Sequence, residues 1–188
     1  MRKPRADSVR NRERLLAAAR EVFSAGGPDA SLDAVARTAE VGIGTLYRHF
    51  PTREALFIAV YQREVDELGT LAERLSKSTP PVEALRQWLR AGVRMIATKK
   101  GMVAALEPTV DSSAAVYVDT ATRVREALAG LVRRAVDAGE LRGDVSSEEI
   151  LRVMIGLCYT REQPDWQESV VRLIDIFVDG LTRRGEDR

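Results

Sequence analysis

Residues 31–61 decide the fold of this chain and read SLDAVARTAEVGIGTLYRHFPTREALFIAVY. Ser31 stands where a helix N-cap belongs, so a short helix is predicted directly after it. The inner face of that helix is expected to be formed by Leu32, Val35 and Ala36. The segment Glu-Val-Gly at 40–42 ends this helix and leads into a second short helix over residues 43–50.

Longer helices are predicted on both sides of this pair. The preceding helix runs over about 11–24 and stops at the Gly-Gly-Pro of 26–28, because Gly and then Pro commonly follow a helix C-terminus. The following helix begins with Thr52 as a plausible N-cap and continues to about Leu75. Two very short helices joined by a three- or four-residue break are typical of a helix-turn-helix.

The second short helix is suited to entering the major groove of DNA, which is about 12 Å wide. Leu46 and Phe50 are expected to anchor it to the first short helix and the turn, through Val35 and Val41. The polar residues then point the opposite way, and Gly44 has no side chain to keep the backbone from DNA. These polar residues are Thr45, Arg48 and His49, with Tyr47 at their flank.

The rest of the chain shows helical periodicity without strand-like alternation, so we predict an all-α fold with about nine helices. Residues 1–53 are expected to form the DNA-binding headpiece and 54–188 a ligand-binding and dimerisation domain, connected by the helix at about 52–75. Residues 76–81 are the best candidate linker, and a separate short segment is expected from Gly101 to Glu107, ending at Pro108. Ser146 and Glu149 are three residues apart, which predicts a capping box for a later helix.

The distribution of charge separates the two regions, although the whole chain carries only +1. Residues 1–53 carry +4 and the remainder −3. A basic end on an acidic body fits a phosphate-binding headpiece, and a solvated basic tail fits the charges equally well. The single cysteine, Cys158, excludes an internal disulfide, and no apolar run reaches the roughly 18 residues of a membrane span. A cytoplasmic protein without a cofactor is expected.

The stretch 31–61 closely resembles the headpiece of TetR-family regulators, and the match covers about residues 11–61. The residues that fall at the family's spacing are Thr45, Leu46, Tyr47, His49 and Phe50. The phrase DAGELRGDVSSEEILRVMIGL, at 137–157, resembles the turn into the dimerisation helices of one actinobacterial-type subgroup. The resemblance implies a sequence-specific regulator, most simply a repressor that a small-molecule ligand releases from a palindromic operator.

The resemblance also implies roles for individual residues. Ser31 and Thr45 are expected beside backbone phosphates or base edges, Tyr47 and His49 on phosphates, and Arg53 as a phosphate clamp. Ile43, Gly44 and Arg48 would lie nearest the bases. Alternatives stay open, because Tyr47 can be a half-buried anchor and Arg48 a phosphate contact. The segment with Arg2, Lys3 and Arg5 reaches into a minor groove or remains a solvated tail.

Two residues depart from the family's pattern. Glu40 stands where the family usually has Gly in the turn, a left-handed position that costs another residue roughly 1–2 kcal/mol. Ile43 stands where many members place a polar or basic reader, and the helical periodicity alone would turn it partly inward.

Two further sites are expected in the C-terminal region. A roomy apolar pocket for an effector would be lined by Trp88, Met95, Met102, Leu106, Tyr117 and Tyr159, with Glu107 or Thr120 as polar handles, unless these residues are plain core. The last two helices show apolar stripes wider than one buried face needs, which predicts a homodimer. The stripes contain Leu151, Met154, Ile155, Cys158, Trp166, Val170, Leu173, Ile174, Phe177 and Leu181.

Two other classes of protein are alternatives to a ligand-controlled regulator. An enzyme is disfavoured because one His and one Cys allow neither a Cys-His pair nor a multi-His metal site unless the headpiece histidine takes part, and no Gly-rich phosphate loop is present. An architectural DNA binder would need only a filled C-terminal core. Cys158 is most simply a small apolar residue of the core or interface, with redox sensing as the alternative.

Overall fold

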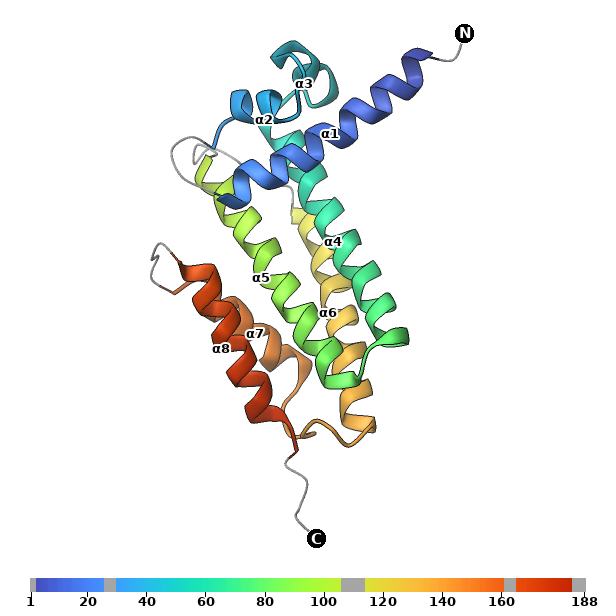
Figure 1. Cartoon of the computed structure of the whole chain (residues 1–188), viewed down its shortest axis with the longest axis vertical. Helices are drawn as coiled ribbons and strands as arrows, with labels where there is room; N and C mark the ends of the chain where they lie inside the picture. Colours follow the sequence, from blue (N-terminus) through green and yellow to red (C-terminus); the bar gives the residue numbers. More distant parts are fainter. Residues whose placement is uncertain (1–2, 26–29, 106–113, 161–164, 184–188) are drawn as a thin grey trace. The chain divides into compact units, whose positions relative to one another are not determined.

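A computed structural model describes residues 3–25, 30–105, 114–160 and 165–183. These residues form eight α-helices and no strand, in agreement with the all-α prediction (Figure 1). None of the helices within these ranges is long and apolar enough to cross a membrane. The helices are α1 (Lys3–Ala25), α2 (Leu32–Thr38), α3 (Ile43–His49), α4 (Arg53–Ser78), α5 (Pro81–Ala105), α6 (Ala114–Asp137), α7 (Ser147–Cys158) and α8 (Trp166–Leu181).

The chain divides into two compact units that are interleaved in sequence. The first unit comprises 1–64 and 97–114, and the second comprises 65–96 and 115–188. Because α4 and α5 each continue from one unit into the other, the end of α5 belongs with the N-terminal helices. The expected boundary at residue 53, between a DNA-binding headpiece and a ligand-binding and dimerisation domain, concerns function and stays a prediction.

In the first unit, α1 packs against α2, and α2 against α3. Leu15, Val35 and Leu46 contribute fully buried side chains from these three helices in turn. Ser31 Oγ accepts a hydrogen bond from Ala34 N at 3.2 Å, and Thr52 Oγ1 accepts one from Ala55 N at 3.1 Å. The N-caps predicted for α2 and α4 are therefore confirmed, and they stabilise the first turns of these two helices.

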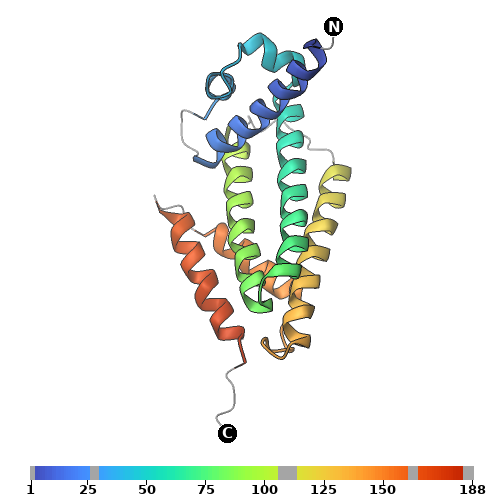
Figure 2. The ribbon, with the colours of Figure 1, turned by 45° about the vertical axis from the view of Figure 1, so that its right-hand side comes forward.

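In the second unit, the later half of α4, the first half of α5 and α6 run side by side, as both views show (Figures 1 and 2). Trp88 is fully buried, and its Nε1 donates a hydrogen bond to the Leu68 carbonyl oxygen at 3.1 Å. The helices α7 and α8 pack on each other. The capping box of α7 is present as predicted, because the Ser146 and Glu149 side chains each bond the other's backbone N–H.

Three helix boundaries differ from those predicted. Helix α1 begins at Lys3 instead of Asn11, because Pro4 is tolerated in a first turn and no helix breaker lies between it and residue 11. Helix α4 continues to Ser78, where the Ser76 and Ser78 hydroxyls donate back to the carbonyl oxygens of Glu73 and Arg74.

Helix α5 is the third difference. It runs through Gly101 to Ala105, although a separate short segment was expected from Gly101 to Glu107. A helical glycine costs only about 1 kcal/mol relative to alanine, so a single one does not end a long helix. Glu107 lies outside the described residues.

Candidate nucleic-acid interface

Helix α3 presents two distinct faces. Leu46 is completely buried, and Phe50 directly after the helix is 3% exposed, as expected of residues that anchor this helix to the core. On the other side, Tyr47 is 46% exposed and Arg48 is also exposed, while Thr45 and His49 are half-buried. The helix is therefore held by one face and offers the other to a binding partner.

Ile43 and Gly44 form the exposed start of this helix. Ile43 is 38% exposed and does not tuck into the core as its helical periodicity suggested. A Cβ atom built on Gly44 would meet no protein atom within 4 Å. The protein itself therefore does not require glycine at position 44, and the space in front of it is open to a large partner.

Ser31 and Arg53 lie at the starts of α2 and α4, on the two sides of the α2–α3 pair. Ser31 is half-buried, and its hydroxyl is already engaged in the α2 cap. Arg53 is exposed. The neighbouring Glu54 carboxylate has its pKa lowered by backbone hydrogen bonding at the helix N-terminus and by the Thr52 hydroxyl. A site for backbone phosphates at this position would depend on the Arg53 guanidinium.

Glu40 adopts the left-handed conformation expected of the turn, with φ at 52°. It is the only non-glycine residue with a positive φ in the described part of the chain. Its carboxylate accepts a hydrogen bond from Arg14 Nη2 at 2.5 Å, which joins the turn to α1. The side chain is 83% exposed, so this ion pair recovers only part of the strain.

Ionic and cation–π contacts join α1 to α4 and to the end of α3. Glu64 of α4 is 6% exposed, and its carboxylate lies 2.9 Å from Arg20 Nε of α1. A second pair joins Arg63 to Glu13 at 2.6 Å. The Arg12 guanidinium lies 5.4 Å from the centre of the Phe50 ring. Together these contacts fix α1 against α4 and against the end of α3.

The expected dimer residues fall into two groups. Leu151, Met154, Cys158, Val170, Ile174 and Leu181 are buried within the chain's own core. Ile155 and Leu173 are 41% and 45% exposed, and Trp166 and Phe177 are half-buried. The outer surface of α7 and α8 thus retains large apolar side chains that the single chain leaves uncovered.

Sequence reasoning missed two members of that outer surface. Ile176 is 67% exposed and Tyr159 is 56% exposed. Neither Ile176 nor Val178 belongs to the stripe predicted from the sequence. The structure buries Val178 and leaves Ile176 exposed. The sequence could have indicated Ile176, because the apolar residues of α8 cover more than one face of the helix and a single stripe does not include them all.

The residues proposed to line an effector pocket have different surroundings. Trp88 and Thr120 are buried in the second unit and Met95 is half-buried there, while Tyr159 is exposed. Met102 is buried in the first unit. Leu106 and Glu107 lie outside the described residues, as does the side chain of Tyr117. The effector pocket therefore stays a prediction.

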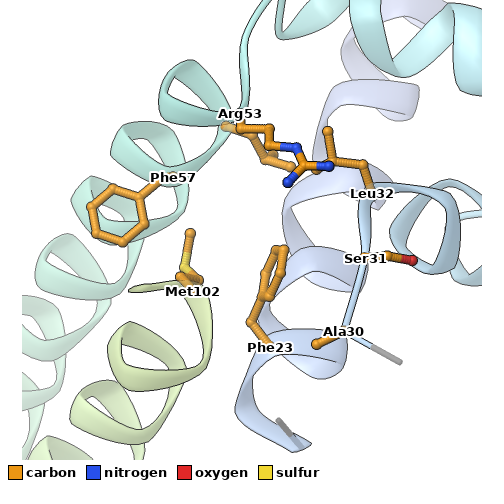
Figure 3. A pocket seen from close by; sticks show the side chains of 8 residues that line it. Phe23, Ala30, Ser31, Leu32, Arg53, Phe57 and Met102 are labelled. Atoms are coloured by element: carbon orange, nitrogen blue, oxygen red, sulfur yellow. The ribbon is translucent and has the colours of Figure 1, made fainter. Parts of the chain in front are cut away.

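A cavity that sequence reasoning did not anticipate lies in the first unit. It is lined by residues of α1, α2, α4 and α5, including Phe23, Leu32, Arg53 and Met102 (Figure 3). These residues are far apart in sequence, so no local pattern indicated that they meet.

Comparison with known proteins supports a regulatory role. Residues 15–60 match the profile described as bacterial regulatory proteins of the tetR family, and residues 80–183 match the C-terminal domain of SbtR-like transcriptional regulators. The chain is 26% identical over 158 residues to the regulator UidR of Escherichia coli, covering 79% of this chain and 78% of UidR. It is 38% identical over 72 residues to the repressor KstR of Mycolicibacterium smegmatis, a match that spans only 37% of this chain and 35% of KstR.

Solved structures give broader coverage. A TetR transcriptional regulator from Streptomyces coelicolor is 41% identical, with a TM-score of 0.79 over 93% of this chain and 99% of that one. A TetR regulatory protein from Mycobacterium vanbaalenii is 33% identical, with a TM-score of 0.73 over 95% and 99% of the two chains. These matches span both the headpiece and the C-terminal helices, and the chain belongs to the TetR family of bacterial transcriptional regulators.

Proposed function

We propose that this regulator binds a palindromic DNA operator by placing α3 in the major groove. The observation that carries the proposal is the two-faced α3, in which Leu46 is buried while Ile43, Gly44, Tyr47 and Arg48 remain exposed. Contacts with the DNA backbone phosphates would set the position of the protein along the duplex, and residues at the start of α3 would read the bases. The residues expected to make these phosphate contacts are Ser31, Thr45, His49 and Arg53. A DNA target also implies that the protein acts in the cytoplasm.

The proposal includes a homodimer formed through α7 and α8. Four large apolar residues on these helices or directly after α7 are more than 40% exposed in the single chain: Ile155, Tyr159, Leu173 and Ile176. A two-fold copy of this surface would cover them in a four-helix bundle. Two-fold symmetry in the protein then requires a palindromic operator, with half-sites about 34–36 Å apart or a multiple of that.

Repression relieved by a small molecule is the finer part of the proposal. The relative KstR is named a repressor, and its similarity to this chain lies over 72 residues. Helix α4 contains 26 residues and continues from the first unit into the second, so it spans about 39 Å at 1.5 Å per residue. An effector between α5 and α6 would act through this continuous helix, to the extent that its affinity differs between the DNA-bound and released arrangements.

Selection of bound duplexes from a random DNA library tests the proposed function directly. The expected product is one sequence with two-fold symmetry, recovered by the wild-type protein. Enrichment of no sequence above the starting library would contradict sequence-specific binding.

Sedimentation tests the dimer separately. Ile176→Asp should convert a stable dimer into a monomer at micromolar concentration, because a charge replaces apolar surface at the interface. Val9→Asp is a matched control, since Val9 is 60% exposed on α1 and lies outside the proposed interface. A wild-type protein that is already monomeric at this concentration would overturn the assembly.

A further inference from the structure

The cavity of the first unit has a volume of about 60 Å³. Its wall is apolar over most of its extent, formed by Phe23, Leu32, Leu56, Phe57 and Met102. One water molecule needs roughly 10–15 Å³ of such a volume, so the cavity accommodates about four to six groups of the size of a water. The cavity is therefore large enough for a small organic molecule.

Arg53 supplies the positive charge of the lining. Figure 3 shows its side chain reaching from α4 towards Leu32, with Phe23 and Met102 also facing the space. Ser31 also lines the cavity, but its hydroxyl accepts the Ala34 N–H as the cap of α2. The cavity thus combines an apolar body with one guanidinium, which is the group best matched to a carboxylate.

We propose that this cavity binds a short-chain monocarboxylate, about the size of butyrate, with its carboxylate on Arg53 and its alkyl chain between Phe23, Phe57 and Met102. Small-molecule sites are typically apolar with a few polar groups that fix orientation. An inorganic anion would leave the apolar wall unused, and a neutral molecule would form no charge-assisted hydrogen bond with the guanidinium. The chemistry of the lining therefore selects an amphipathic anion.

Occupation of this site has a consequence for DNA binding, which rests on the proposed function. Arg53 is the residue proposed to clamp a backbone phosphate at the start of α4. The Arg53 guanidinium cannot form its full set of hydrogen bonds with a carboxylate in the cavity and with a phosphate outside it at the same time. A bound monocarboxylate should therefore weaken DNA binding from within the DNA-binding unit, independently of any effector in the second unit.

Methionine methyl resonances of the DNA-free protein give a site-specific test. Titration with butyrate should shift the Met102 methyl signal saturably, while Met154, buried in the second unit, serves as an internal reference. Butyramide and inorganic phosphate should each bind at least tenfold more weakly. A Met102 signal that does not move, or that moves equally with all three compounds, would overturn the site.

Two variants separate charge from space. Arg53→Gln should reduce butyrate affinity to the level of butyramide, and Arg37→Gln is the matched control, because Arg37 is an exposed arginine of α2 outside the lining. Ala30→Leu fills the cavity while keeping Arg53, and it should abolish the Met102 shift. Unchanged butyrate binding in both Arg53→Gln and Ala30→Leu would contradict the proposed site.

Binding of the selected operator tests the consequence at constant ionic strength. Saturating butyrate should lower the wild-type affinity for DNA at least fivefold and leave that of Ala30→Leu unchanged. If butyrate binds but DNA affinity is constant, the competition is wrong although the site stands. If the protein binds no duplex DNA, the proposed function fails, and the Met102 titration still decides the cavity separately.

Discussion

Gly101 of α5 lies so close to α1 that a Cβ atom built on it would be 1.9 Å from the carbonyl oxygen of Phe23. Both residues belong to the first unit. The obstructing atom is part of the backbone and cannot rotate away as a flexible side chain would. Glycine at position 101 is therefore what allows the end of α5 to pack directly on the end of α1.

Replacement of this glycine should destabilise the protein. Gly101→Ala forces α1 and α5 apart, and we expect the free energy of unfolding to fall by about 1–3 kcal/mol, the usual cost of overpacking. Gly69→Ala is the matched control, because no atom lies within 4 Å of a Cβ at this position of α4. The control should gain up to about 1 kcal/mol from helix propensity. Equal stability of the two variants in urea unfolding would refute the close contact.

Glu40→Gly should leave stability unchanged or raise it by up to about 1 kcal/mol. The left-handed conformation costs a non-glycine residue roughly 1–2 kcal/mol, while the exposed ion pair with Arg14 contributes about 0–1 kcal/mol. The additional backbone entropy of glycine offsets part of the gain. Thermal unfolding measures the balance, and a loss of more than 1 kcal/mol would mean that the Arg14 contact outweighs the strain.

Asp175 of α8 should make folding sensitive to acid. Arg90 Nε and Nη2 donate to its two carboxylate oxygens at 2.9 and 2.7 Å. The Arg90 hydrogen bonds, with Arg86 nearby, lower the pKa of this carboxyl below its ordinary 3.8. A lowered pKa in the folded state stabilises folding fully above the unfolded value. This contribution is lost as the pH falls through the folded pKa.

Asp175→Asn should therefore reduce stability near neutral pH and flatten its decline between about pH 5 and pH 3. The contribution is expected to be about 0.5–1 kcal/mol, because the pair is only partly buried. Asp7→Asn on the exposed surface of α1 is the control. Parallel pH profiles of wild type and Asp175→Asn, measured by urea unfolding, would show that the ion pair has no net effect.

Salt dependence should distinguish the residues of the proposed interface. Replacing Tyr47 with Phe or Arg53 with Gln should weaken binding to every DNA sequence. The loss of the Arg53 charge should also reduce, by about one unit, the slope of the logarithm of the binding constant against the logarithm of the salt concentration. Replacing Arg48 should cost roughly 1–3 kcal/mol at one base pair if this side chain reads guanine. Equal losses on the operator and on random DNA would identify Arg48 as a phosphate contact.

Features that depend on near neighbours in sequence were predictable. The caps by Ser31, Thr52 and Ser146 follow from side-chain hydrogen bonds over three residues, and the structure confirms all three. The left-handed conformation of Glu40 was implied by the family resemblance, in which glycine usually occupies this position of the turn, and the structure confirms it. Local chemistry determines these features, so a single sequence contains the necessary information.

Features that depend on packing between distant segments were not predictable. Ile43 is apolar and at a position that periodicity assigns partly to the interior, but the short α3 is already held by Leu46 and Phe50. Ile176 and Val178 are both apolar, and only the packing of α8 leaves the first exposed and buries the second. The meeting of Phe23, Arg53 and Met102 around a cavity likewise requires three separate helices.

The affinity of Gly44→Ala for the selected operator is the most direct test of major-groove binding by α3. The open space at Gly44 means that the added methyl group meets no protein atom, so the variant should fold with wild-type or slightly higher stability. If the backbone of α3 approaches DNA at this point, the methyl group obstructs it, and operator affinity should fall at least tenfold. A stable Gly44→Ala protein that binds the operator as tightly as wild type would contradict this account.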